Sequence, residues 1–230
     1  MLAGAREALP ENRTQLALQL RWSSYARTLS GAQVVNAAGD QRLTAAFASA
    51  SVQHFLGHGW SVDLSVPVGV VQLESNTSPS ASTLVGLADI EVGGRYDFAA
   101  LWGAVGYRPS LTLRLGLGFP SGRRGTFDAP GLAPNLVATG SGTNSASGNL
   151  AFTQFVHKRV GLHAWLGVWA PMDRADDGLR PGPQLTFGLG GFWQVVRPLA
   201  VAARLDGRSI GRADERENGT VLASGGHTLA

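Results

Sequence analysis

Apolar and polar residues alternate with a period of two along most of this chain, and this alternation restricts its fold more than any other feature. In residues 60–70, one parity is apolar throughout and the other holds small or polar residues. The apolar set is Trp60, Val62, Leu64, Val66, Val68 and Val70. A period of two places the two sets on opposite faces of a strand, whereas a helix needs a period near 3.6. The pattern therefore predicts strands with one apolar and one polar face.

The same alternation recurs from one end of the chain to the other. It is regular in residues 16–22, 111–119, 185–195 and 199–205, and less regular in residues 41–56, 149–156 and 161–170. Residues 41–56 are rich in alanine and change parity midway, which predicts a β-bulge there. With residues 87–98, the chain is predicted to form nine strands. Several have the length of a tilted membrane-spanning strand, about 9–11 residues.

The connections between these strands alternate between long polar segments and short ones. Long connections are predicted at residues 28–40, 74–83, 120–148, 171–183 and 209–227. Short connections are predicted at residues 57–59, 99–106, 157–160 and 197–198. Such a sheet has two ends that face different surroundings, as in outer-membrane barrels with short periplasmic turns and long extracellular loops. We therefore expect an all-β, up-and-down antiparallel transmembrane β-barrel.

Composition agrees with a barrel and excludes several other classes of protein. Only 15% of the 230 residues are charged and 31 are glycine, as expected when half of every strand faces lipid. The chain has no cysteine, so disulfide frameworks, Cys-ligated metals and thiol nucleophiles are excluded. A net charge of +3 from dispersed side chains does not indicate nucleic acid as a partner. No run of about 18 apolar residues predicts a membrane-spanning helix.

Aromatic residues gather near the ends of the predicted strands. They are Trp22, Tyr25, Phe55, Trp60, Phe98, Trp102, Tyr107 and Phe119. Such positions are typical of the aromatic girdles at the two membrane interfaces of a barrel. Aromatic residues in the core of a soluble β-sandwich are the alternative explanation.

The number of strands predicts that the barrel is incomplete. If the first strand starts in the periplasm, nine strands leave the chain outside, and only residues 227–230 remain for a tenth. Single-chain bacterial barrels have an even number of strands, and an open edge in lipid leaves backbone groups unsatisfied. We expect about nine strands of a barrel of about 10–12, with one or more carboxyl-terminal strands missing. Residues 1–13 are expected to be a periplasmic segment and residues 14–230 the incomplete barrel.

Three short motifs resemble segments of one family of outer-membrane transporters. They are Gly86-Leu-Ala-Asp-Ile-Glu-Val-Gly-Gly-Arg-Tyr-Asp-Phe98, Leu115-Gly-Leu-Gly-Phe-Pro-Ser-Gly122 and Gly140-Ser-Gly-Thr143. They are similar to the GLGD, strand-exit and GTGS segments of the family named for the meta-pathway of phenol degradation, although Ala88 stands where that family usually has glycine. The resemblance spans roughly residues 14–210. It implies a barrel of about twelve strands that passes small, often hydrophobic, organic molecules.

Charged residues on the polar parity are candidates for the lining of the barrel, because polar side chains of such a barrel point inward. The candidates are Arg21, Asp63, Asp89, Glu91, Arg95, Arg114, Arg204 and Asp206, with Asp97 and Arg208 beside them. Two roles fit these residues equally. They form structural ion pairs across strands, or they line a water-filled lumen.

Enzymatic and metal chemistry find little support in the residues. Of the five histidines only His163 lies mid-strand, and the chain has no G-x-S-x-G sequence. Asp173, Asp176 and Asp177 do not match a calcium loop. For the basic residues 121–125, contact with lipopolysaccharide phosphates and plain solvation both stay open. No catalytic residue, metal or cofactor is predicted.

The leading hypothesis is a passive pore or transporter for small, hydrophobic organic molecules in the bacterial outer membrane. Its partners would be outer-membrane lipid, lipopolysaccharide and the small-molecule solute, with no nucleic acid. Two alternatives stay open: a barrel lipid hydrolase, and a soluble lipocalin-like binding barrel, whose apolar face would point inward.

Overall fold

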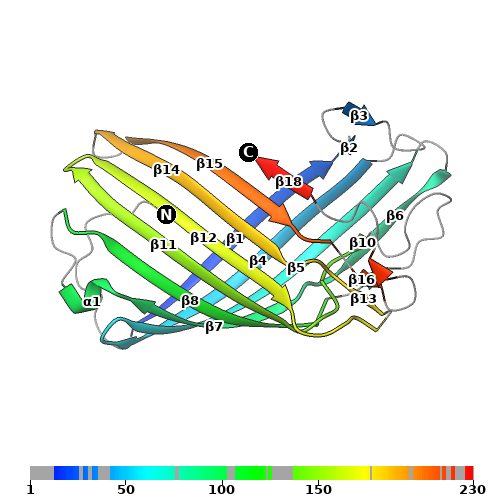
Figure 1. Ribbon diagram of the computed structural model, residues 1–230, viewed down its shortest axis with the longest axis horizontal. Helices are drawn as coiled ribbons and strands as arrows, with labels where there is room; N and C mark the ends of the chain where they lie inside the picture. The colour runs from blue at the N-terminus through cyan, green and yellow to red at the C-terminus, as the bar shows by residue number, and fades with distance from the viewer. Residues whose placement is uncertain are drawn as a thin grey trace.

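The computed structural model describes residues 13–25, 28–30, 33–35, 42–75, 78–102, 107–122, 124–125, 137–176, 178–196, 199–212, 214–215, 219–220 and 226–229. The predicted periplasmic segment therefore lies outside the described residues, except for Arg13. One strongly curved sheet of long tilted strands dominates the molecule (Figure 1). Within the described ranges, no helix is long and apolar enough to cross a membrane.

The long strands follow one another around the sheet. They are β1 (Thr14–Tyr25), β4 (Arg42–Gly57), β5 (Trp60–Ser75), β6 (Ser78–Leu87), β7 (Ile90–Asp97), β8 (Ser110–Phe119), β11 (Ser145–His157), β12 (Val160–Pro171), β14 (Gln184–Val196) and β15 (Leu199–Ile210). All their pairings are antiparallel. Both β6 and β7 pair with β5 and are separated only by Ala88 and Asp89, so they form one interrupted strand. The prediction of an all-β, up-and-down sheet of nine strands is confirmed.

Short elements lie at the two ends of the sheet. They are β2 (Thr28–Ser30), β3 (Gln33–Val35), α1 (Ala99–Trp102), β9 (Arg124–Gly125), β10 (Val137–Ala138), β13 (Leu179–Arg180), β16 (Asp214–Glu215), β17 (Gly219–Thr220) and β18 (Gly226–Leu229). The helix α1 lies at the end with the short turns, whereas β10, β13 and β16 lie at the end with the long connections (Figure 1). The two ends therefore differ as the sequence predicts.

The sheet does not close on itself within the described residues. There, β1 pairs only with β4, and β18 pairs only with β15. The four residues of β18 pair with Gly207–Ile210, so they begin a tenth strand. The expectation of an open barrel is confirmed, and β1 and β18 are its two edges.

Two local predictions are wrong. β4 keeps one register from Arg42 to Phe55, and its only irregularity lies beside the turn, between Phe55 and Gly57. The apparent change of parity in residues 41–56 came from Phe47, an apolar residue that faces inward over Gly69, whereas Val52 is exposed on the outer face. Residues 74–83, predicted as a loop, are mostly strand, because β5 extends to Ser75 and β6 begins at Ser78. Polar residues form strands there because that end projects beyond the apolar band, where neither face needs to be apolar.

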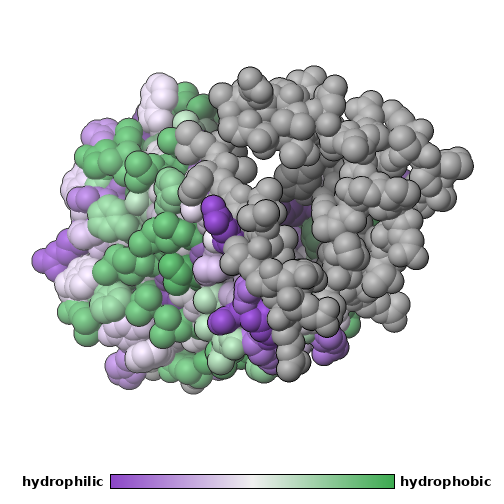
Figure 2. Space-filling view, turned by 45° about the vertical axis from the view of Figure 1, so that its right-hand side comes forward, coloured by the Kyte–Doolittle hydropathy of each residue, from purple (hydrophilic) through white to green (hydrophobic). Residues whose placement is uncertain are grey.

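The outer face of the sheet is apolar and exposed. Leu16, Leu18 and Leu20 are 74–79% exposed, and Figure 2 shows patches of apolar residues on the coloured part of the surface. On β5 the outward row runs over ten residue steps from Trp60 to Val70, which is about 34 Å along a strand. At a tilt of about 40° this row is about 26 Å high, close to the apolar band of an outer-membrane barrel.

Several of the predicted girdle aromatics are exposed on the outer face. Trp22, Trp60 and Phe119 are exposed there, together with Trp193, which the prediction omitted. Phe98 and Trp102 belong instead to the turn that contains α1, where their rings stack 6.3 Å apart. The side chain of Tyr25 lies outside the described residues.

Candidate functional site

The inward face of the sheet holds the charged residues that the sequence singled out, in two separate groups. The first group crosses β5, β7, β8 and β11, where Asp63, Gly93, Gly116 and Ser147 are successive cross-strand neighbours. A Cβ on Gly93 would lie 2.7 Å from Nη2 of Arg114, and one on Gly116 would lie 2.6 Å from Oε1 of Glu91. The two glycines therefore leave the space in which the Arg114 side chain lies along the wall.

Arg114 joins two carboxylates from neighbouring strands. Its Nη2 lies 2.6 Å from Oδ2 of Asp63, and its Nη1 lies 2.8 Å from Oε1 of Glu91. Nε also donates to Asp63, and the Ser147 hydroxyl donates to Glu91. Side-chain exposures of 17% for Arg114 and 12% for Asp63 show that this pair of the Arg114 cluster is largely shielded from solvent, whereas Glu91 is 34% exposed. Charge-assisted bonds of this kind are stronger than neutral ones, so the cluster ties strands β5 to β11 together.

Asp89 lies at the interruption between β6 and β7, and its carboxylate accepts hydrogen bonds from two other segments. Oδ1 accepts from the Gly122 backbone N–H at 3.1 Å. Oδ2 accepts from the Ser141 hydroxyl at 2.6 Å and from the Ser141 N–H. The Ser121 hydroxyl donates to the Ala88 carbonyl, and the Thr139 hydroxyl to the Leu87 carbonyl. We call Asp89, Ser121, Gly122, Thr139, Gly140 and Ser141 the Asp89 cluster.

The second group of lining candidates lies across β12, β14 and β15. Trp165 rests on Gly188, where a Cβ would lie 1.9 Å from the indole ring. The His163 ring stacks on Trp165 with centroids 5.6 Å apart. The Arg204 guanidinium lies 4.0 Å from the centroid of Trp165, and its Nε lies 2.6 Å from Oδ2 of Asp206. A flat aromatic and cationic surface therefore faces the interior.

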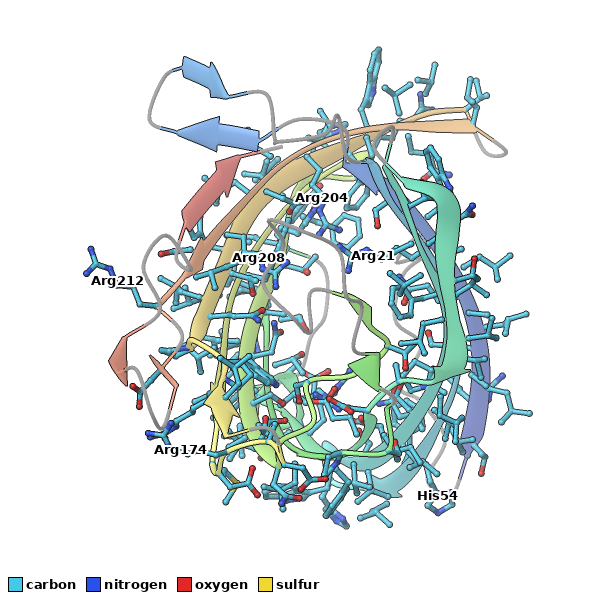
Figure 3. The ribbon with its side chains drawn as sticks, turned by 90° about the vertical axis from the view of Figure 1, so that its right-hand side faces the viewer. Arg21, His54, Arg174, Arg204, Arg208 and Arg212 are labelled. Carbon is cyan, nitrogen blue, oxygen red and sulfur yellow. The ribbon has the colours of Figure 1, made fainter. Side chains whose placement is uncertain are left out.

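The remaining candidates are placed as follows. Arg21, Arg204 and Arg208 point into the ring of strands, whereas His54, Arg174 and Arg212 lie at its periphery or outside it (Figure 3). Nη2 of Arg208 donates to Oε1 of Gln184 at 2.6 Å. Arg95 is half-buried and is the cross-strand neighbour of Arg114.

The two groups differ in charge. On the wall formed by β5, β7 and β8, the described inward-facing carboxylates are Asp63, Glu91 and Asp97, and the guanidiniums are Arg95 and Arg114. On β15 and β1, Asp206 is the one carboxylate beside Arg21, Arg204 and Arg208 among the described inward-facing residues. One wall of the interior is therefore richer in acidic groups and the other in basic groups.

Sequence reasoning missed the hydroxyl groups that complete these clusters. Ser121, Thr139, Ser141 and Ser147 donate to carbonyls or carboxylates across long sequence separations. Ser121 and Ser141 lie inside the motifs that carry the family resemblance, which was the available signal. Ser121 and Gly122 also belong to the basic residues 121–125 and bond to the Asp89 region, whereas the arginine side chains of that stretch lie outside the described residues.

Comparisons with known proteins bear on the fold. No protein-family model and no curated protein matches the sequence. The structure is similar to the crystal structure of an outer membrane channel from Pseudomonas putida F1, with a TM-score of 0.73 and 14% sequence identity. The match covers 94% of this chain and 79% of that one. The chain thus has the fold of an outer-membrane barrel, and the matched protein is a channel rather than an enzyme.

Proposed function

We propose that this protein is a passive channel of the bacterial outer membrane for small organic molecules. The observation that carries the proposal is the sidedness of the sheet. Large apolar side chains are exposed on its outer face, while the Arg114 cluster and the Arg204–Asp206 pair occupy its inner face. A soluble lipocalin-like barrel needs the reverse arrangement, because its apolar side chains bind the ligand inside.

The fold supports the same proposal. A barrel of this size with polar side chains inside can enclose a path for solutes. We propose that Arg21, Asp63, Asp89, Glu91, Arg95, Arg114, Arg204 and Asp206 border this path. Outer-membrane lipid would contact the apolar outer face, and lipopolysaccharide would surround the end with the long connections.

We further propose membership of the family named for the meta-pathway of phenol degradation, with small and often hydrophobic solutes. Three motifs support this proposal because they form one structural unit. Asp89 of the first motif accepts hydrogen bonds from Gly122 of the second and Ser141 of the third. Leu87 of the first motif accepts one from Thr139, which directly precedes the third. Motifs that meet in space are better support for a shared fold than three separate matches of common residues.

The proposal is tested by reconstituting the full-length protein into planar bilayers and liposomes. We expect ion conductance in the bilayers, and swelling of liposomes in solutions of small organic solutes but not of large oligosaccharides. Absence of both conductance and solute flux from correctly folded protein would contradict the channel function.

A further inference from the structure

Two short strands of the connection between β8 and β11 lie inside the barrel. β9 and β10 pair with each other inside the ring of long strands, and β10 lies beside β5 (Figure 3). The connection leaves β8 through Ser121 and Gly122 and returns to β11 through residues 139–144. We call these two described stretches its outgoing arm and its returning arm.

Both arms meet at one carboxylate in the wall. Asp89 accepts from Gly122 of the outgoing arm through Oδ1 and from Ser141 of the returning arm through Oδ2. Asp89 is half-buried, and Thr139 and Thr143 of the returning arm are buried, with exposures of 4% and 1%. A half-buried carboxylate that accepts several hydrogen bonds holds their donors more firmly than a neutral acceptor would.

The arms bind to the wall where the strand is interrupted, at Ala88 and Asp89. Three backbone groups at the interruption are satisfied by hydroxyls of the arms rather than by a neighbouring strand. The Leu87 carbonyl accepts from Thr139, and the Ala88 carbonyl accepts from Ser121. The Ile90 N–H donates to the Ser121 oxygen. An interruption without these arms would leave backbone polar groups unpaired, so the arms and the interruption belong together.

Two glycines allow the arms to approach each other. A Cβ on Gly122 would lie 2.4 Å from Cα of Gly140, and one on Gly140 would lie 2.1 Å from Oδ1 of Asp89. Neither position has space for a side chain while both arms remain bound. Glycine is therefore needed at both positions for the two arms to bind Asp89 together.

We infer that Asp89 is the positioning residue that fixes both arms to the wall, keeps β9 and β10 in the lumen, and so sets the size of solute that passes. The inference rests on the proposed channel function and adds the residue that determines its size limit. Removing the carboxylate frees the Gly122 and Ser141 donors and leaves the Ser121 and Thr139 hydroxyls to hold the arms, so we expect the arms to loosen and the lumen to widen.

The test compares Asp89→Ala and Ser141→Ala with the control Asp214→Asn. Asp214 pairs with Arg174 in the exposed connections and touches no part of the Asp89 cluster. In planar bilayers and liposome-swelling assays, we expect Asp89→Ala to raise the conductance and admit larger solutes than the parent. Ser141→Ala, which retains the carboxylate, is expected to have a smaller effect in the same direction, and Asp214→Asn to match the parent.

A second measurement reports on the arms without relying on flux. The chain has no cysteine, so Thr143→Cys introduces a unique thiol at a position that is 1% exposed. We expect a water-soluble maleimide to label this thiol slowly in the parent and at least about tenfold faster with Asp89→Ala, since labelling of a protected site follows local opening. Adding Asp214→Asn instead should leave the labelling rate unchanged.

The outcomes separate the two proposals. In one outcome, the parent passes solutes, and Asp89→Ala and Ser141→Ala change neither the conductance, nor the size limit, nor the labelling rate. That outcome would overturn the role of Asp89 and leave the channel function intact. Absence of flux from parent and variants would overturn the channel and, with it, the size limit. Mobility on gels with and without heating checks that each variant is folded, and Ser141→Ala decides the question if Asp89→Ala does not assemble.

Discussion

The two charged walls of the barrel interior are built differently. In the Arg114 cluster, one guanidinium binds two carboxylates, and the side-chain exposures of Arg114 and Asp63 are 17% and 12%. On the opposite wall, Arg204 pairs with Asp206 on its own strand, and their exposures are 59% and 39%. Shielded pairs tie strands together, whereas exposed groups remain available to water and solutes. We therefore propose mainly a structural role for the first wall and mainly a solute-facing role for the second.

Removing the central guanidinium tests the structural role most severely. Arg114→Ala leaves Asp63 and Glu91 without their cation in a shielded site, and we expect a loss of about 3 kcal/mol in the free energy of unfolding. Urea titration of the protein folded into lipid vesicles measures this loss. A loss below about 1 kcal/mol in the free energy of unfolding is typical of exposed surface ion pairs. That result would mean that the two walls do not differ in their contribution to stability.

A methyl group beneath the same guanidinium tests its packing. Gly93→Ala puts a Cβ 2.7 Å from Nη2 of Arg114, and we expect a loss of about 1–2 kcal/mol as the arginine shifts. The matched control is Gly94→Ala on the outer face, where a Cβ meets nothing within 4 Å. The control should be neutral or stabilising by about 0.5 kcal/mol, measured by the same urea titration. Equal losses for both variants would show that strand propensity, and not Arg114, sets the effect.

Changes on the exposed wall should alter permeation more than stability. We expect Arg204→Ala to cost less than about 1 kcal/mol, because the pair is exposed. The reversal potential in a salt gradient should shift toward cations, since a positive charge leaves the lumen. The control is Arg212→Ala, whose side chain lies outside the ring (Figure 3). An unchanged reversal potential for Arg204→Ala, or an equal shift for Arg212→Ala, would assign this wall a structural role too.

The sequence predicted much of the fold because the decisive signal is local. Alternation from Trp60 to Val70 identifies both faces of β5 without reference to any other strand, and the long and short connections define the two ends. The prediction was wrong where side-chain polarity does not report the face. Phe47 of β4 is apolar but faces inward over Gly69, and the polar residues at the ends of β5 and β6 form strands through backbone pairing.

The candidate site was predicted in part. Parity selected Asp63, Glu91 and Arg114 as inward-facing, but it could not show that they meet, because Asp63 and Arg114 are 51 residues apart. It selected Asp89 without its partners, although Ser141, 52 residues away, lies within a motif that was noticed for another reason. Trp165 made the polar face of its strand hard to identify from the sequence. In the structure, its ring packs against the guanidinium of Arg204.

By itself, the sequence determined that this chain forms an antiparallel sheet with an apolar outer and a polar inner face, because side chains on a strand alternate with a period of two wherever the strand is placed. Only the tertiary structure decided which inward charges neutralise each other and which remain exposed. It also decided that the two described arms of the connection between β8 and β11 bind at Asp89. Those contacts depend on the register between strands and on the close approach of Gly122 to Gly140, which no local pattern of residues specifies.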